Sequence, residues 1–422
     1  MKCSKDVNLR FLIKNLFKIN IKESGFKMKT KIGVMFGGRS VEHEVSIISG
    51  IQALNNIDKE KYDAIPIYIT RENEMYVGDL VGKVESYTNL KNLIANSQRV
   101  VLINNGNKVD LVKYPYKIFD KHIYDTIDIA FPVVHGTNVE DGTLQGYLKT
   151  LNIPFVGCDV TASCVGMDKY VMKAVLKENN IPVLDCIRVN DYEYIEDNED
   201  TIYKIMNKLD FPVITKPVNL GSSVGIKIAK NKDELVEAVE YAFQFSKQIL
   251  VEKAITNLKE INCSVLGDVS DCKPSECEEP ITSGEILSYE DKYISGKTKK
   301  TGGSKGMTSL DRKLPADIDE NTKNEIQKLA VETFKALNCN GVVRIDFMID
   351  MDTNKIYVNE INTIPGSLAF YLWEATGIKY KELIDMLINL ALKRNREQNN
   401  LSFSYDTKIL EGYKGGLKGI KK

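Results

Sequence analysis

The stretch VVRIDFMIDMDTNKIYVNEIN, Val342–Asn362, contains two runs of alternating apolar and polar residues joined by the polar tetrapeptide MDTN. Alternation with a period of two is typical of β-strands that are buried on one face. The pattern therefore predicts two paired strands with a turn between them. Arg344 and Asp346 would share one face of the first strand. Glu360 and Asn362 would share one face of the second.

If the two strands pair, Asp346 can lie beside Glu360 and Asn362. Two carboxylates and an amide oxygen suit a hard cation such as Mg²⁺, which takes oxygen ligands. Arg344, beside a metal-binding carboxylate, would stabilise a developing oxyanion. The alternative interpretation is a solvated strand face with a surface ion pair. Both interpretations require the same half-buried sheet.

A second stretch, FPVITKPVNLGSSVG (Phe211–Gly225), predicts a strand that ends in a loop of small residues. The strand delivers Lys216, and lysine is rarely buried without a partner. Backbone N–H groups and the Ser222 hydroxyl in the loop would suit phosphate oxygens, with Lys216 as the counter-charge. Lys169 begins a predicted helix, where a cation opposes the helix dipole. It is therefore a second candidate for phosphate binding, or else a plain surface lysine.

The composition excludes several classes of protein. With 422 residues the chain is long for one core, so two or three domains are expected. A formal net charge of -1 argues against general nucleic-acid binding, and no run of about twenty apolar residues would span a membrane. The cysteines lack a disulfide or zinc spacing, so we expect reduced thiols in a cytoplasmic protein. Neither a P-loop nor a G-x-G-x-x-G motif is present, so any nucleotide is bound in another way.

Hydrophobic periodicity predicts alternating strands and helices, an α/β chain with α+β character in its C-terminal half. Besides the stretches above, strands are predicted at 31–38, 62–70, 128–136, 153–158, 248–255 and 260–268. Helices are predicted at 46–57, 142–152, 167–180, 233–245, 321–338 and 380–398.

Taken together, a series of motifs resembles the D-alanine–D-alanine ligases of the ATP-grasp superfamily. The motifs are GGRSVEHEVSIISG, HGTNVEDGTLQG, MDKYVMK, TKPVNLGSSVG, VEKAI, GEILSYEDKY and RIDFMID…NEINTIPG, in the family's order over roughly residues 30–395. The resemblance implies a three-domain ATP-grasp fold with ATP between the central and C-terminal domains. The expected divisions are an extension at 1–27, an N-terminal domain at 28–157, a central domain at 158–252, a C-terminal domain at 253–396 and a basic tail at 397–422.

The resemblance also implies roles for individual residues on the amino-acid side of the site. Glu42 would bind the ammonium of the first D-alanine and form a closing triad with Ser222 and Tyr293. Arg344 and the Gly366 amide would hold the oxyanion. The remaining residues expected to contact the substrates are His135, Glu140, Asp141 and Ser367.

On the nucleotide side, the resemblance implies that Lys169 and Lys216 hold the ATP phosphates. Lys292 would reach them from a mobile ω-loop at 288–313. The adenine would meet Glu252, Lys253 and Ile255, and the ribose would meet Glu260. Two Mg²⁺ ions, or Mn²⁺, would be bound by Asp346, Glu360 and Asn362.

The implied activity is ATP-dependent ligation of two D-alanines through a D-alanyl phosphate, for peptidoglycan precursor synthesis, by a cytoplasmic homodimer that binds neither nucleic acid nor membrane. Three features depart from the family pattern. Val139 replaces a usual glycine, the acidic segment 272–283 looks like a surface hairpin variant, and SLAFYLW (367–373) replaces small hydroxyl residues that meet the second substrate. A ligase with another acceptor (D-serine, D-lactate or another amine) and a nucleotide-binding paralogue without ligase activity therefore stay open.

Overall fold

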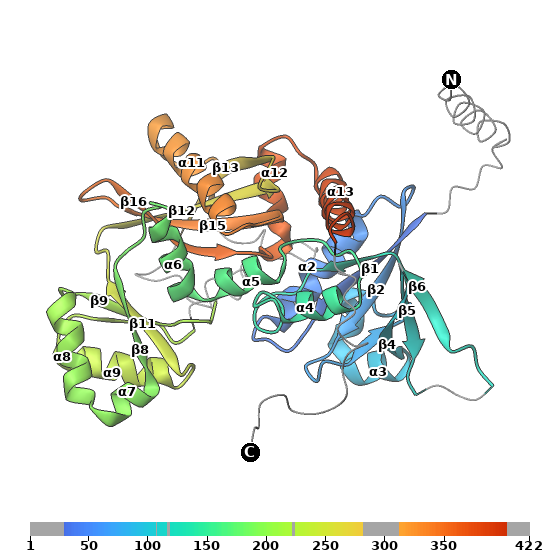
Figure 1. Ribbon diagram of the computed structural model, residues 1–422, viewed down its shortest axis with the longest axis horizontal. Coiled ribbons are helices and arrows are strands. Elements are labelled where there is room, and N and C mark those ends of the chain that lie inside the picture. The colour runs from blue at the N-terminus through green and yellow to red at the C-terminus, as the bar shows by residue number, and fades with distance from the viewer. Residues whose placement is uncertain (1–28, 107, 116–118, 222–223, 282–311, 403–422) are drawn as a thin grey trace, which may run out of the picture.

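The computed structural model describes residues 29–106, 108–115, 119–221, 224–281 and 312–402. The described strands form three sheets, and each sheet is the centre of one lobe (Figure 1). Along the chain, the N-terminal sheet is followed by a small sheet and then by the C-terminal sheet.

The N-terminal lobe contains a seven-stranded sheet in the order β6-β5-β4-β3-β2-β1-β7. β1 (Thr30–Gly37) runs parallel to its two neighbours, β2 (Tyr62–Ile69) and β7 (Ile129–Pro132). The last six residues of β1 are all buried, so the strand is a continuous apolar run without alternation. The remaining strands pair antiparallel and are β3 (Met75–Val77), β4 (Gln98–Asn105), β5 (Lys108–Lys113) and β6 (Ile123–Ile127).

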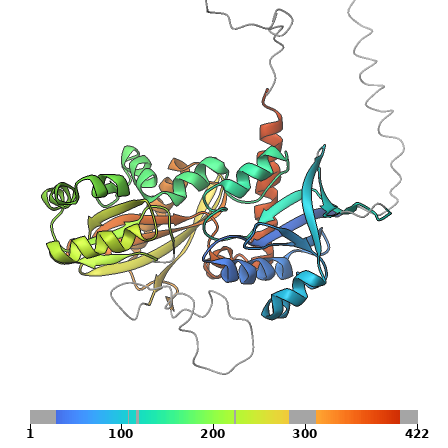
Figure 2. The ribbon, with the colours of Figure 1, turned by 90° about the horizontal axis from the view of Figure 1, so that it is seen from below.

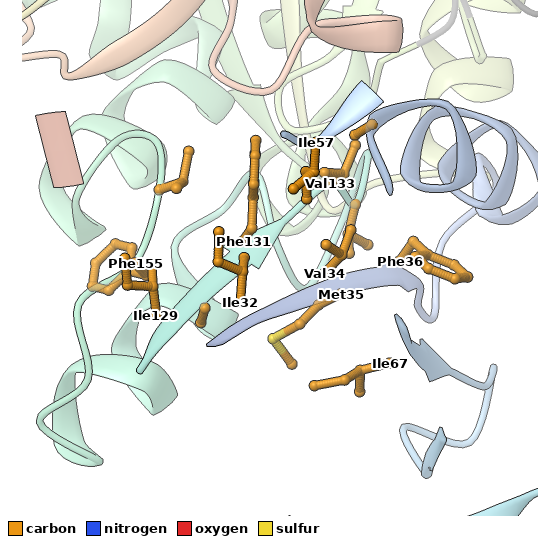
Figure 3. Close-up of a cluster of buried hydrophobic side chains, with 14 of the residues drawn as sticks. Ile32, Val34, Met35, Phe36, Ile57, Ile67, Ile129, Phe131, Val133 and Phe155 are labelled. Atoms are coloured by element: carbon orange, nitrogen blue, oxygen red, sulfur yellow. The ribbon is translucent and has the colours of Figure 1, made fainter. Parts of the chain in front are cut away.

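Short helices pack around this sheet: α2 (His43–Asn56), η1 (Val84–Asn89), α3 (Leu90–Ala95) and α4 (Thr143–Thr150). Figure 3 shows part of the core, where buried side chains of β1 and β7 meet those of neighbouring segments. The chain leaves β1 through Gly37, whose φ of +98° and close approach to the Ile69 carbonyl leave no room for a Cβ. This turn directs the chain into α2.

The small sheet has the order β10-β9-β11-β8. Its strands are antiparallel and are β8 (Cys186–Asn190), β9 (Val213–Pro217), β10 (Lys227–Ala229) and β11 (Gln248–Lys253). Helices α7 (Asp191–Glu196), α8 (Asn198–Lys208) and α9 (Lys232–Phe243) belong to the same lobe, and α8 and α9 supply much of its apolar core.

The C-terminal sheet has the order β14-β13-β12-β15-β16 and is antiparallel throughout. Its strands are β12 (Leu258–Gly267), β13 (Cys272–Pro280), β14 (Arg312–Lys313), β15 (Gly341–Asp350) and β16 (Lys355–Asn362). Helix α11 (Glu320–Ala336) packs on this sheet, and so do α5 (Val160–Met167) and α6 (Lys169–Glu178). The two helices that precede the small sheet in sequence thus join the core of the C-terminal sheet.

The last described segment returns to the N-terminal lobe. After the 3₁₀ turn η3 (Gly366–Ala369) and α12 (Phe370–Ala375), helix α13 (Tyr380–Asn399) buries its apolar face in the N-terminal core. Figure 2 shows α13 (red) beside the blue N-terminal sheet. A helix assigned by sequence to the C-terminal domain therefore connects that domain to the N-terminal lobe.

Most of the predicted elements are confirmed, and the pair β15/β16 has the predicted turn. Two predictions are wrong. Residues 153–158 do not form a strand, since Phe155 makes only a single bridge to Ala130. The acidic segment 272–283 is not a surface hairpin, because its part in β13 lies inside the sheet and buries Glu278. Within the described ranges, no helix is long and apolar enough to cross a membrane.

Candidate active site

A cavity of about 210 Å³ lies where the three lobes meet. Its walls are formed by side chains of α2, the loop after β7, α6, the small sheet, β12, β15 and β16. The residues of the sequence prediction that line it are Glu42, His135, Glu140, Lys169, Lys216, Lys253, Ile255, Glu260, Arg344, Asp346, Glu360, Asn362 and Gly366. Segments far apart in the sequence are thus brought to one place.

The predicted carboxylate face is formed by the register of β15 and β16. Arg344 is opposite Asn362, and Asp346 is opposite Glu360. The Arg344 guanidinium donates to both carboxylate oxygens of Asp346, at 2.7 and 2.8 Å. The Asn362 amide donates to Asp346 at 3.1 Å. Antiparallel pairing therefore gathers two carboxylates, one amide and one arginine at the cavity wall, as the alternation predicted.

This donor set fits a divalent cation. Across the described residues, no three His, Cys, Asp or Glu side chains gather in a way that could hold a metal. A site on β15 and β16 therefore requires an amide oxygen as its third protein donor, and Asn362 offers one when its amide group is turned over. Carboxylate and amide oxygens are ligands for Mg²⁺, which commonly keeps waters and substrate phosphates in the rest of its shell.

Next to Asp346 and Glu360, a β-bulge in β16 interrupts the alternation of side chains along that strand. The register shifts so that Asp346 pairs with Glu360 and Phe347 pairs with Val358, which leaves Asn359 as the extra residue. Asn359 lines the cavity, and its amide oxygen accepts a hydrogen bond from Lys216 at 3.2 Å. Strict alternation would turn Asn359 away from Glu360, so sequence reasoning missed this residue.

Lys216 ends β9 almost fully buried, and its partner is Glu252 on β11. The Glu252 carboxylate is fully buried and also pairs with Lys173 at 2.9 Å. Burial alone would raise the pKa of Glu252, but the charges of Lys173 and Lys216 outweigh it and lower the pKa to about 2. Glu252 does not line the cavity, and its carboxylate lies between the two lysines.

Lys169 is held at the start of α6. The N-cap Asp168 accepts hydrogen bonds from the Tyr170 and Val171 amides, at 3.0 and 2.9 Å, which fixes the first turn. The Lys169 ammonium donates to the Leu220 carbonyl at 2.7 Å and lies 3.5 Å from Glu360. The side chain therefore points into the cavity and is not a plain surface lysine.

His135 connects the N-terminal lobe to the turn after β16. Its Nδ1 donates to the Ile364 carbonyl at 2.7 Å, and its Nε2 accepts from the Ser49 hydroxyl at 2.9 Å. The Ser49 oxygen in turn accepts from the Ser367 amide at 3.0 Å. Burial lowers the pKa of His135, so the ring is neutral and keeps this tautomer. The role of His135 in this arrangement is to join two lobes at the cavity.

Two carboxylates, Glu42 and Glu140, line the N-terminal side of the cavity. Glu140 accepts hydrogen bonds from the Gly136 amide at 2.7 Å and the Ile364 amide at 3.2 Å. Burial, followed by the charge of Glu42, raises the pKa of Glu140 to about 8. Asp141 does not reach the cavity, because its carboxylate accepts from the backbone amides of Asn138 and Thr143 and closes the turn before α4.

The turn after Gly366 brings Gly366 to the cavity and turns Ser367 away from it. Ser367, Leu368 and Ala369 have φ values of 51°, 55° and 49°, a left-handed run without glycine. The Ser367 hydroxyl donates to Gln52 of α2 at 2.6 Å and is buried there. The expected contact of Ser367 with the second substrate is therefore not supported by its position, and Tyr371 lines the cavity instead.

Three predicted residues, Ser222, Lys292 and Tyr293, lie outside the described residues, as does most of the expected ω-loop. The last two residues of that predicted loop form β14. The cavity also contains residues that sequence reasoning did not assign, and the charged ones on the C-terminal side are Glu278 and Arg312. They come from strands distant in sequence, and no local pattern marks them as neighbours.

Comparison with known proteins gives two matching family models. One, described as the D-ala D-ala ligase N-terminus, matches residues 31–158. The other, described as the D-ala D-ala ligase C-terminus, matches residues 175–389. Together they cover most of the chain.

Individual relatives agree with these models. The D-alanine–D-alanine ligase of Thermosipho melanesiensis is 40% identical over 381 residues, which is 90% of this chain and 98% of that protein. The D-alanine–D-alanine ligase of Clostridium acetobutylicum is 39% identical over 375 residues, covering 87% of this chain and 99% of that protein.

Among solved structures, the VanG D-Ala:D-Ser ligase from Enterococcus faecalis matches with a TM-score of 0.71 and 32% identity, over 86% of this chain and 100% of that one. The D-alanine–D-alanine ligase from Coxiella burnetii has a TM-score of 0.70 and 31% identity, over 88% and 96% of the two chains. A Bacillus anthracis D-alanine–D-alanine ligase complexed with ATP has a TM-score of 0.61 and 27% identity, over 87% and 99%.

Proposed function

The chain belongs to the D-alanine–D-alanine ligase family, and from that premise we propose how its own residues join two D-alanine molecules. It has the ATP-grasp fold of its structural neighbours. It is an ADP-forming ligase of a carboxylate with an amine, and its dipeptide product serves peptidoglycan synthesis.

The observation that carries the proposal is the convergence of three kinds of group on one cavity. Glu42 offers a carboxylate from the N-terminal lobe, Lys169 and Lys216 offer ammonium groups near the small sheet, and Arg344 with Asp346 faces them from the C-terminal sheet. A ligase that couples ATP to amide formation needs all three, because it must hold an amino acid, phosphates and a developing oxyanion at once.

The reaction has two steps. In the first, a carboxylate oxygen of one D-alanine attacks the γ-phosphorus of ATP, ADP leaves, and an acyl phosphate forms. In the second, the neutral amine of another D-alanine attacks the acyl carbon, and the tetrahedral intermediate expels phosphate. Water must be excluded between the steps because it would hydrolyse the acyl phosphate. The Lys292, Tyr293 and Ser222 roles proposed from sequence belong to that closure.

The positions of the described residues support the following proposed roles. Glu42 binds the ammonium of the first D-alanine and thereby directs its carboxylate toward the phosphates. Lys169 and Lys216 neutralise phosphate oxygens during transfer, as point charges do in phosphoryl transfer. Arg344 and the Gly366 amide stabilise the oxyanion of the tetrahedral intermediate. The adenine lies against Lys253 and Ile255, and the ribose against Glu260, all of which line the same cavity.

We propose that Asp346, Glu360 and Asn362 hold two Mg²⁺ ions, with Mn²⁺ as a substitute. When bound, such ions neutralise phosphate charge and orient the transferred group. Arg344 keeps the Asp346 carboxylate in a fixed orientation through its two hydrogen bonds. Lys169, 3.5 Å from Glu360, positions that carboxylate against the phosphate side of the cavity.

The test is turnover of ATP and Mg²⁺ with D-alanine, with the product mass recorded and L-alanine, D-serine and D-lactate offered in parallel. We expect equal release of ADP and phosphate and formation of D-alanyl-D-alanine. Glu360→Gln should abolish turnover, whereas Glu374→Gln, at an exposed position of α12, should not change it. ATP binding without phosphate release would contradict the proposal. Product formed only with D-serine or D-lactate would move the chain to the ligases with another acceptor.

We further propose that the enzyme is a cytoplasmic homodimer that binds neither nucleic acid nor membrane. Its need for ATP and the free state of the cysteines in the described ranges support a reducing, ATP-containing compartment. The formal net charge of -1 opposes nucleic-acid binding. The family resemblance supports the dimer, and sedimentation should give twice the 47.6 kDa of one chain. A single species at the monomer mass would contradict the dimer.

A further inference from the structure

A hydrogen bond that crosses between two lobes orients the Lys216 side chain. Lys216 lies near the end of β9 in the small sheet, and its ammonium donates to the amide oxygen of Asn359, on β16 of the C-terminal sheet, at 3.2 Å. Both side chains line the cavity. The bond therefore places the ammonium relative to Glu360, the next residue of β16 and a member of the proposed metal site.

The bulge in β16 makes this contact possible. Successive side chains of a strand alternate between two faces, so a regular strand would point Asn359 and Glu360 in opposite directions. The bulge adds one residue to β16 at this point, and both side chains line the cavity. The strand thus presents a neutral acceptor to Lys216 and, from the next residue, a carboxylate to Lys169, whose ammonium lies 3.5 Å from Glu360.

The charges around Lys216 show why the neutrality of this acceptor matters. Glu252 is fully buried, and its carboxylate pairs with Lys216 and also with Lys173, at 2.9 Å. Two ammonium groups share one carboxylate, so the three side chains carry one positive charge in excess. Such a charge is costly to bury without an anion. Asn359 orients Lys216 without adding a negative charge, and the excess charge is kept for a ligand in the cavity.

The two acceptors also fix the direction of the ammonium. A lysine ammonium has three N–H donors at the end of a flexible four-carbon chain, so it takes a defined direction only where its surroundings impose one. Glu252 accepts from Lys216 on the side of the small sheet, and Asn359 accepts on the side of the C-terminal sheet. With both contacts made, the third donor serves the cavity that Lys216 lines.

Resting on the proposed ligase function, we propose that Asn359 is a positioning residue for the nucleotide: it holds the Lys216 ammonium toward the phosphates and leaves its charge for them. Asn359 acts through Lys216 and does not bind the adenosine part of ATP. Its contribution is therefore specific to nucleotides that carry phosphates, and a nucleoside without phosphates should bind independently of it.

The experiment compares the binding of ADP and of adenosine to the full chain. Isothermal titration calorimetry gives the Kd of ADP, and displacement of ADP gives the Kd of adenosine, both in EDTA so that the affinities report the protein's own cations. Asn359→Leu has a side chain of similar size and lacks the acceptor. We expect it to raise the Kd of ADP at least about fivefold, as the loss of a hydrogen bond to a charged group should do, and to leave the Kd of adenosine unchanged.

A second variant tests the argument from charge. Asn359→Asp retains an oxygen beside Lys216 but supplies the negative charge that the cluster lacks, so it should also raise the Kd of ADP and spare adenosine. If only Asn359→Leu weakens ADP binding, the argument from charge is overturned and the positioning role stands. Asn389→Leu is the matched control, since Asn389 is exposed on α13 and donates to the Asp385 carbonyl there, and it should change neither Kd.

The wild-type chain separates this inference from the proposed function. If it binds ADP neither in EDTA nor in Mg²⁺, the proposed function fails, and if it binds ADP only in Mg²⁺, Asn359→Leu is compared with it in Mg²⁺. If the wild-type chain binds ADP and Asn359→Leu binds it equally well, the inference is overturned and the proposed function stands. An equal rise of both Kd values also overturns it, because Asn359 would then only support the shape of the cavity. If Asn359→Leu does not fold, Asn359→Ala is judged by the same comparison.

Discussion

Replacing Glu252 by glutamine should destabilise the protein strongly, although Glu252 does not line the cavity. The carboxylate has no exposed surface, and the two lysine side chains beside it, Lys173 and Lys216, are 3% and 7% exposed. Removing its charge leaves two buried ammonium groups facing a neutral amide. Breaking a buried ion pair in this way typically costs about 3–5 kcal/mol, because the remaining charge stays desolvated and unpaired.

The pKa of Glu252 gives a second, independent value for the contribution of its carboxylate to the free energy of unfolding. It is lowered from an ordinary 4.5 to about 2, with burial opposing the shift and the two lysines producing it. At about 1.4 kcal/mol per unit, the ionised carboxylate contributes about 3 kcal/mol to the free energy of unfolding. Since the folded pKa is depressed, this contribution is fully present above pH 4.5 and is lost as the pH falls toward 2. The cost of breaking a buried ion pair and the pKa shift of Glu252 therefore give similar values for the loss of stability.

The assay is urea denaturation at pH 7, with circular dichroism as the signal and the first transition analysed. Glu252→Gln should lower the free energy of unfolding by about 3 kcal/mol and raise the KM for ATP, because Lys216 loses the partner that positions it. Asp200→Asn is the matched control, since the Asp200–Lys204 pair has a distance of 2.6 Å but is 48% and 72% exposed. Such a surface pair should contribute less than about 1 kcal/mol. If the two variants lose equal stability, the reasoning about the buried pair is refuted.

Three other predictions follow from the described contacts. Ser264→Ala removes the hydroxyl that accepts the indole N–H of Trp373 at 3.0 Å, so it should lower the free energy of unfolding by about 1–3 kcal/mol. Urea denaturation followed by the fluorescence of this sole tryptophan measures the loss, and an unchanged denaturation midpoint would contradict it. Because the pKa of Glu140 is raised to about 8, this group's contribution to the unfolding free energy falls by about 1.4 kcal/mol per pH unit from about pH 5 to 8, and Glu140→Gln should flatten that slope. Asp346→Asn should lower kcat by roughly 10²-fold or more. Asp350→Asn, at the last residue of β15, should leave kcat unchanged, and equal losses in the two variants would contradict the proposed role of Asp346.

The parts of the site that sequence predicted are those set by local periodicity. Arg344 and Asp346 share a face because they are two residues apart on a strand, and Glu360 and Asn362 for the same reason. The only further assumption was that the two strands pair, which places the face with Arg344 and Asp346 beside the face with Glu360 and Asn362. Lys169 was a candidate for a similar local reason, since a cation at the start of a predicted helix opposes the helix dipole.

The parts that sequence missed depend on tertiary structure. Asn359 faces the cavity only because a bulge adds one residue to β16, and nothing in the alternation marks that position. Glu278 was assigned to a surface hairpin because its segment is acidic, yet the sheet places it between two strands, where Tyr371 and Arg312 satisfy its charge. A charged run indicates exposure on average, but a paired carboxylate can be buried.

Helix α13 shows why the lobes are held together at the cavity. Its sequence predicts a long amphipathic helix, but periodicity does not reveal which core receives the apolar face. In the structure that face enters the N-terminal core, and Asp385 on the same helix accepts a hydrogen bond from Tyr62 of β2 at 2.6 Å. His135 makes a second link through the Ile364 carbonyl. Because both links come from the segment after β16, the N-terminal lobe and the C-terminal sheet are fixed relative to each other on either side of Glu42 and Arg344. The small sheet carries Lys216 and has an apolar core of its own, so we expect it to take part in the closure proposed for Lys292, Tyr293 and Ser222.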